Sequence, residues 1–110
     1  MMVTIKQGDS VAIFFNLAVN GKTLTPDMVE DLEIYVGDVL GYYYKTGGVK
    51  FDTVNQRWYI WPSQEETFGL DEGSYKVEVR PKYRDNNVTV KGFELNDKIK
   101  VKASSSREVL

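Results

Sequence analysis

The sequence predicts an all-β sandwich of about seven to nine antiparallel strands, with one or two short helical turns. Alternation of apolar and polar residues, the period of a strand, recurs along most of the 110-residue chain. Aromatic residues make up 13% of it, led by seven tyrosines, and they favour strands. Gly, Asn and Asp separate the alternating segments at short intervals, as turns do. The length suits one domain, which we expect to span residues 1–103 before a flexible tail at 104–110.

The first part of the chain predicts two strands. Residues 3–7 (VTIKQ) alternate, and they form the first strand. Residues 10–19 (SVAIFFNLAV) give the strongest signal, because every second residue from Val11 to Val19 is a large apolar one. The opposite face of this segment is nearly apolar too, which indicates a strand covered on both sides. Asn20-Gly21 then predicts a tight turn, since both residues tolerate a positive φ.

A helical turn and a strand are expected next. Thr25, Pro26 and Asp27 have the order of a helix N-cap, a first helical residue and a first-turn acid. Residues 31–38 (DLEIYVGD) return to alternation, and they predict a strand whose apolar residues face the core.

Three short strands are expected in the middle of the chain. Residues 41–52 predict two of them, as a hairpin around Gly47-Gly48. Residues 57–61 (RWYIW) predict the third, which Pro62 ends because proline lacks the N–H of a strand ladder.

Residues 63–80 predict a crossover that leads into a core strand. Ser63 and Glu66 have the spacing of a capping box, in which each side chain bonds the other residue's backbone N–H. We expect this helical turn to end at Gly69 in the left-handed conformation. Residues 74–80 (SYKVEVR) then alternate, and Pro81 is expected to interrupt the strand.

The last segment, residues 86–104, predicts two strands around a turn at Asn96-Asp97. The expected core combines the inward residues of the predicted strands. They are Val11, Ile13, Phe15, Leu17, Ile34, Val36, Trp58, Ile60, Tyr75, Val77 and Val79.

The composition argues against catalysis. The chain has no Cys and no His, so it lacks thiolates, the commonest general base and the commonest metal ligand. Paired acids such as Glu65/Glu66 and Asp71/Glu72 fall at an expected helix start and turn, and no spacing marks a cleft. We therefore expect no enzyme activity and no cofactor. Calcium binding by these pairs, or by the acids between residues 27 and 33, stays open because carboxylates ligate calcium.

Charge is unevenly distributed along the chain. The net charge is −2, but residues 1–75 carry 5 basic and 11 acidic residues, while residues 76–110 carry 9 and 5. Either acidic and basic strands pair within one sheet, or the molecule has an acidic and a basic side suited to subunit association. We expect no nucleic-acid partner at this net charge. We also expect no membrane segment, since no apolar run approaches about 18 residues, and the start lacks a signal peptide.

Aromatic residues are the main candidates for a binding surface. In residues 57–61, Trp58 and Ile60 share one face and Tyr59 and Trp61 the other, and only one pair can face a single core. A run of three tyrosines raises the same question. Cover by the chain's own loops, a subunit interface and a sugar-stacking platform are the alternatives. The candidate interface or glycan-binding residues are Tyr42, Tyr43, Tyr44, Tyr59 and Trp61.

Two segments carry a resemblance to a known family. They are the opening VTIKQGDSVAIFFNL and the crossover QEETFGLDEGSYKVEVR. Between about residues 3 and 101 the chain resembles small structural proteins of tailed bacteriophages and of prophages in Gram-positive bacteria. Within these it is most similar to the immunoglobulin-like N-terminal domain of baseplate upper proteins. The Cys–Trp–Cys signature of antibody domains is absent.

The resemblance implies an immunoglobulin-like sandwich without catalytic residues. It also implies a homo-oligomer that assembles with other phage structural proteins, is made in the bacterial cytoplasm and ends in the virion tail. The alternative function is that of a carbohydrate-binding module that recognises cell-surface polysaccharide.

Overall fold

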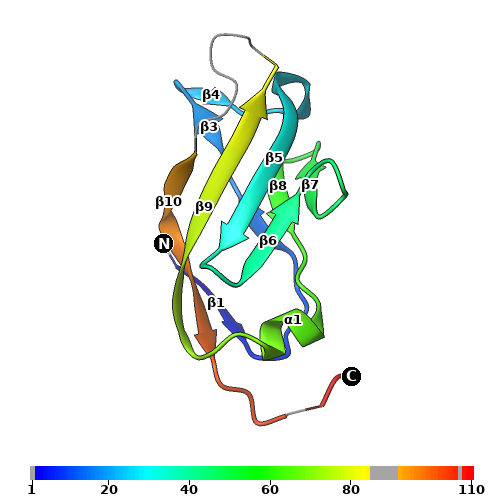
Figure 1. The fold of residues 1–110 in the computed structure, drawn as a ribbon, viewed down its shortest axis with the longest axis vertical. Coiled ribbons are helices and arrows are strands. Elements are labelled where there is room, and N and C mark those ends of the chain that lie inside the picture. Colours follow the sequence, from blue (N-terminus) through cyan, green and yellow to red (C-terminus); the bar gives the residue numbers. More distant parts are fainter. Residues whose placement is uncertain (1, 85–91, 107) are drawn as a thin grey trace.

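The computed structural model describes residues 2–84, 92–106 and 108–110. These residues form a β-sandwich about twice as long as it is wide, with extents of 48 × 23 × 23 Å (Figure 1). One layer is a five-stranded sheet in the order β1-β10-β9-β5-β6, and the other is a three-stranded sheet in the order β2-β8-β7. A two-stranded hairpin, β3-β4, lies at one end of the sandwich, and the short helix α1 lies at the other (Figure 1). The predicted all-β sandwich is confirmed.

The elements have the following bounds. The five-stranded sheet contains β1 (Met2–Lys6), β5 (Val29–Val36), β6 (Leu40–Tyr43), β9 (Gly73–Tyr83) and β10 (Phe93–Lys102). The three-stranded sheet contains β2 (Ile13–Phe15), β7 (Val49–Asp52) and β8 (Arg57–Ile60). The remaining elements are β3 (Ala18–Val19), β4 (Lys22–Thr23), the 3₁₀ helix η1 (Pro26–Met28) and α1 (Gln64–Phe68).

The topology is that of an immunoglobulin-like domain. In chain order, β2, β7 and β8 take the places of strands B, D and E, while β5, β6, β9 and β10 take those of C, C′, F and G. The first strand, β1, lies in the five-stranded sheet and pairs with β10 in parallel. The expectation of antiparallel strands throughout is therefore wrong for β1. At the corner before β9, the Tyr75 hydroxyl donates to the Asp71 carbonyl oxygen at 2.6 Å, as in the tyrosine corner of these folds.

The core lies between the two sheets and centres on Trp58. This side chain is fully buried, its Nε1 donates to the Leu24 carbonyl oxygen at 2.8 Å, and the rings of Phe51 and Tyr44 pack edge-on against it. Alternation in β8, and in β5 from Leu32 onward, places every second residue in this core. Of the predicted core residues, all are buried except Tyr75, which is half-buried, and Val11, which is 44% exposed.

Three predictions around the turns and caps are confirmed. Asn20 and Gly21 have φ values of 53° and 77° and join β3 to β4 as a tight hairpin. The capping box of α1 is complete, since the Ser63 hydroxyl accepts from the Glu66 N–H and the Glu66 carboxylate accepts from the Ser63 N–H. Thr25 precedes η1 as its N-cap residue, although its hydroxyl bonds the Asp27 carboxylate and caps no backbone N–H.

The single strand predicted over residues 10–19 is wrong. The structure divides this segment into β2 and β3, and Val11 precedes β2 in an irregular segment. The second face of β2 is also uncovered by the described chain, because Phe14 is exposed.

The hairpin predicted around Gly47-Gly48 is wrong as well. Both strands exist, but β6 pairs with β5 and β7 pairs with β8, so the turn carries the chain from one sheet to the other. The change of sheet buries Tyr42 and Val49 in the same core from opposite sides.

Pro81 does not interrupt β9, which continues to Tyr83. Pro81 pairs with Leu32 of β5, whose carbonyl oxygen accepts from the Tyr44 N–H on its other side. The pair is therefore a non-hydrogen-bonded one, and the missing proline N–H removes no ladder bond to β5.

Two further predictions are wrong. Asn96-Asp97 is no turn but part of a bulge within β10. From Glu94 to Lys98 the chain of β10 advances four positions, while its partners in β9, Glu78 and Lys76, are only two positions apart. Gly69 ends α1 with right-handed angles of −76° and −7°. The strand predicted before Asn96 falls partly on residues 85–91, which lie outside the described residues.

Candidate functional site

The strongest candidate is the outer surface of the three-stranded sheet. Trp58 and Ile60 of β8 point into the core, so Tyr59 and the following Trp61 point away from it. In β2, Phe14 lies directly opposite Tyr59, with ring centroids 5.2 Å apart. Phe14 is 38% exposed and Trp61 60% exposed. We call Phe14, Tyr59 and Trp61 the aromatic face.

A fixed cation lies beside the aromatic face. The Arg57 guanidinium carbon is 3.7 Å from the centroid of the Phe14 ring, and Arg57 Nε is 3.3 Å from an Asp52 carboxylate oxygen. Asp52 also accepts bonds from Asn55 and from the Val54 N–H, and these bonds, led by that of the Asn55 side chain, lower the pKa of Asp52. The carboxylate thus stays charged and holds Arg57 over the ring, an arrangement typical of cation–π contacts.

Two shallow hollows flank the aromatic face. The larger, of about 330 Å³, is lined by the aromatic face together with Ala12, Phe51, Asp52 and Thr53. The smaller, of about 180 Å³, lies between Trp61, Tyr59 and the Gly47-Gly48 turn, and Tyr42 and Lys50 complete its lining. The exposed Trp61 ring therefore has apolar and polar groups on both sides.

Both margins of this surface are open strand edges. The order β2-β8-β7 leaves one edge of β2 and one edge of β7 without a partner strand among the described residues. Such edges present N–H and C=O groups that a further strand can pair with.

The five predicted site residues do not lie on one surface. Tyr59 and Trp61 lie together on the aromatic face. Tyr43 lies on the outer surface of the other sheet, edge-on to Tyr35 with centroids 6.2 Å apart. Tyr44 is half-buried against Trp58.

Tyr42 is buried between the sheets except at the edge of the smaller hollow. Its hydroxyl donates to Glu66 Oε2 at 3.0 Å, which joins β6 to α1. Burial and then this carboxylate raise the pKa of Tyr42 above its ordinary value. Because its hydroxyl already has a partner inside the chain, Tyr42 contributes to the fold more than to a binding surface.

Sequence reasoning did not select Phe14 or Arg57 for this surface. Phe14 lies on the second face of residues 10–19, whose apolar character predicts a strand covered on both sides, but the described chain leaves Phe14 exposed. No sequence signal paired Arg57 with Phe14, because the contact depends on the register of β2 against β8.

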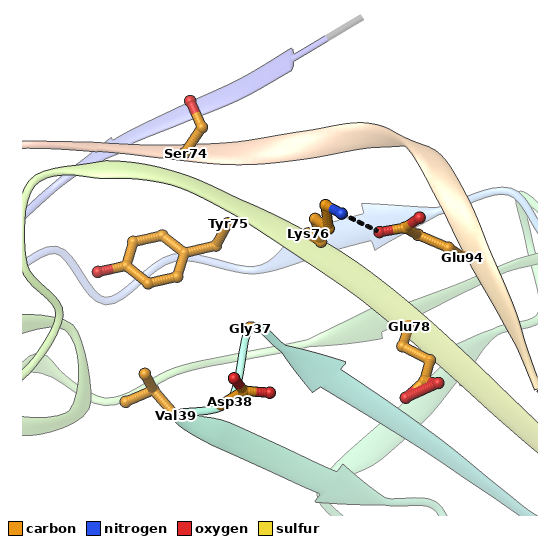
Figure 2. Close-up of a pocket in the computed structure, with 8 residues that line it drawn as sticks. All are labelled: Gly37, Asp38, Val39, Ser74, Tyr75, Lys76, Glu78 and Glu94. Carbon is orange, nitrogen blue, oxygen red and sulfur yellow. Dashed lines mark ion pairs between the residues drawn. The ribbon is translucent and has the colours of Figure 1, made fainter.

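A further hollow lies on the outer surface of the five-stranded sheet near the β5–β6 turn (Figure 2). It measures about 680 Å³ and is lined by Asp38, Glu78 and Glu94 along with Lys76, whose Nζ is 3.7 Å from a Glu94 oxygen. Across the described residues, no group of three or more acidic side chains is arranged to hold a metal ion. The same part of the chain contains no helix long and apolar enough to cross a membrane.

Comparison with known proteins gave no match to a protein-family model, to a curated protein or to a solved structure. The resemblance to phage baseplate proteins therefore stays a prediction from the sequence.

Proposed function

We propose that this chain is a non-enzymatic structural protein that assembles through protein–protein contacts as a baseplate-type component of a phage or prophage tail. The observation that carries the assembly role is the aromatic face, in which Phe14 and Trp61 are exposed and Tyr59 is partly exposed. The tail assignment is supported by the resemblance of residues 3–101. The protein would be made in the bacterial cytoplasm and incorporated into the virion.

The aromatic face has the composition that favours protein partners. Trp, Tyr and Arg are enriched at interfaces and supply most of their strong contacts. Burying the exposed part of Trp61 removes on the order of 100 Å² from water, which contributes about 2–3 kcal/mol at about 25 cal/mol per Å². Arg57 is already held by Asp52, so little side-chain freedom is lost when a partner covers it.

The test is incorporation of a Trp61→Ala variant into phage particles. Mass spectrometry of purified particles should detect the wild-type chain and lose the variant by about tenfold or more, while the purified variant keeps the wild-type melting temperature. Val54→Ala is the matched control, since Val54 is 87% exposed on the β7–β8 turn but outside the aromatic face. A chain that is absent from purified particles, and monomeric at high concentration by light scattering, contradicts the proposal.

Glycan binding is the second candidate, favoured by the open Trp61 ring beside Lys50 and Tyr59 in the smaller hollow. Aromatic rings stack on the apolar faces of sugars, and neighbouring polar groups bond their hydroxyls. A glycan array of bacterial surface polysaccharides tests it, with Trp61→Ala expected to abolish retention without unfolding. Tyr43→Ala serves as the control, because Tyr43 lies on the opposite sheet. An array without signal removes this candidate.

A further inference from the structure

The exposed ring of Trp61 stands between two small residues. The register of β8 against its two neighbours places Ala12 on one side of Trp61 and Gly48 on the other. A methyl group and a hydrogen atom leave room beside a large ring. The two hollows of the aromatic face follow from this, since Ala12 lines the larger and Gly48 the smaller, while Trp61 and Tyr59 line both.

The polar groups left free on this surface are chiefly donors. The Trp61 indole N–H, the Tyr59 hydroxyl and the Lys50 ammonium group have no hydrogen-bond or ion-pair partner among the described residues. The neighbouring carboxylate of Asp52, in contrast, already accepts four hydrogen bonds from its own chain. A ligand that fits the aromatic face therefore has to supply acceptors.

The surface also carries one uncompensated positive charge. Arg57 is neutralised by Asp52, at 3.3 Å, and is held against the Phe14 ring. The exposed Lys50 has no carboxylate within ion-pair distance in the described part of the chain. Lys50 lies directly opposite Tyr59 in the strand register, so its charge borders the rings. The complementary ligand combines apolar rings, carbonyl acceptors and a negative charge.

We infer that the aromatic face binds a proline-rich segment in the polyproline II conformation, with an acidic residue of that segment at Lys50. Such a segment has free backbone carbonyl oxygens, and its prolines lack the N–H donor. Aromatic-lined grooves bind proline-rich segments, and the preformed conformation loses little entropy on binding. This inference rests on the proposed function, because it names the class of partner that the same face would bind.

The strand register gives the spacing that the ligand needs. Phe14 in β2 and Lys50 in β7 lie opposite Tyr59 on its two sides. Two strand spacings of about 4.8 Å place their backbones about 10 Å apart. Polyproline II has three residues per turn and rises about 3.1 Å per residue, so positions i and i+3 share one side at about 9 Å. A proline that packs on Phe14 and Tyr59 therefore requires the acidic residue three positions away in the ligand.

An added β-strand or a sugar complements this surface less fully. Both bring N–H or O–H donors together with their acceptors. The carboxylate nearest to the rings, that of Asp52, is already occupied by its own chain. A proline-rich segment leaves almost no donor of its own unpaired, so it avoids the cost of a donor that binding deprives of water.

The experiment is titration of the full chain with a synthetic peptide of about nine prolines that carries one aspartate near its middle. Fluorescence reports the binding, because Trp61 is exposed and the other tryptophan, Trp58, is fully buried. We expect a saturable blue shift of the Trp61 emission. A peptide with lysine in place of the aspartate should bind about tenfold more weakly. A glycine–serine peptide of the same length with the same aspartate should not bind, since it is disordered and has no rings.

Calorimetry with variants assigns the binding to the aromatic face. Trp61→Ala should abolish it, and Trp61→Phe, which keeps a ring but lacks the indole N–H, should weaken it by about threefold to tenfold. Lys50→Met keeps the apolar stem and should remove the preference for aspartate over lysine in the peptide. Tyr43→Phe is the control, because Tyr43 lies on the other sheet, and it should bind as the wild type does. Unchanged melting temperatures separate these losses from unfolding.

The results distinguish this inference from the proposed function. A chain that needs Trp61 to enter phage particles but does not bind the proline peptide keeps its assembly role and overturns the inference alone. A chain that binds the peptide through Trp61 but is absent from particles supports the binding site and contradicts the tail assignment. Peptide binding that survives Trp61→Ala, or retention of a glycan without any response to the proline peptide, would overturn the inference.

Discussion

Gly37 is the residue on which the β5–β6 turn depends. Its φ is +55°, which L side chains rarely adopt, and a Cβ there would lie 2.9 Å from Cδ1 of the Tyr75 ring. Gly37→Ala should lower the free energy of unfolding by about 2–4 kcal/mol, because the strained backbone adds to the steric conflict. Urea unfolding measures the loss.

Gly47→Ala is the control for this prediction. Gly47 also has a positive φ, +87°, but no atom lies within 4 Å of a Cβ there. This variant should lose only the backbone contribution, about 1 kcal/mol. Equal losses in the two variants would contradict a tight contact between Gly37 and Tyr75.

Tyr42 gives the structure a defined response to alkaline pH. Burial first, and the bond to Glu66 second, raise the pKa of Tyr42 above the value of about 10 that it has in an unfolded chain. The folded state therefore keeps this proton at pH values where the unfolded state loses it. The resulting stability is fully present below about pH 10 and is lost as the pH rises through the folded pKa.

Tyr42→Phe tests this response. The variant should be less stable than the wild type by about 1–2 kcal/mol at neutral pH, since it lacks a hydrogen bond to a carboxylate. That difference should shrink above about pH 10, because only the unfolded wild type then gains free energy by losing the phenol proton of residue 42. Chemical unfolding of both proteins between neutral and strongly alkaline pH measures it. A difference that stays constant throughout would show that Tyr42 titrates equally in both states.

At the scale of elements, α1 fixes the segment between β1 and β2 through hydrogen bonds. Thr67 is the buried polar residue of α1, and its hydroxyl accepts from the Gly8 N–H at 3.0 Å and donates to the Asp9 carbonyl oxygen at 2.7 Å. The capping box starts the helix one turn earlier, so Thr67 reaches both groups from a fixed position.

Thr67→Val replaces the hydroxyl by a methyl group of similar size. The Gly8 N–H and the Asp9 carbonyl then lose their partner, and the free energy of unfolding should fall by about 1–3 kcal/mol. Amide exchange at Gly8 should also accelerate. Thr67→Ser keeps the hydroxyl and should preserve the slow exchange at Gly8, and fast exchange in this variant would assign the protection to packing by the methyl group.

The sequence predicted which residues of a strand face the core, but it did not predict which strands pair with one another. Alternation located β5 and β8 and their inward residues, because the period-two pattern is set by local geometry. The assignment of β6 and β7 to different sheets depends on which partners their edges meet, and no local pattern records this. β9 likewise continues through Pro81 because the Leu32 carbonyl oxygen accepts from the Tyr44 N–H, on the side of β5 that faces away from β9.

The candidate site was predictable only in part for the same reason. The outward direction of Tyr59 and Trp61 could be predicted from the alternation of residues 57–61 alone. Phe14 required knowing that β2 is short and lies at a sheet margin. The uneven charge along the chain was visible in the sequence, but the residues that face each other across the strands were not.

At the scale of the whole molecule, the two outer surfaces differ in chemistry. One sheet presents an aromatic surface and the other a charged surface with a basic and an acidic half. An aromatic surface contributes binding energy through burial, and a charged one sets orientation and rate of association. The two outer surfaces of this sandwich therefore suit different kinds of contact, one stabilised by burial of rings and the other oriented by charge.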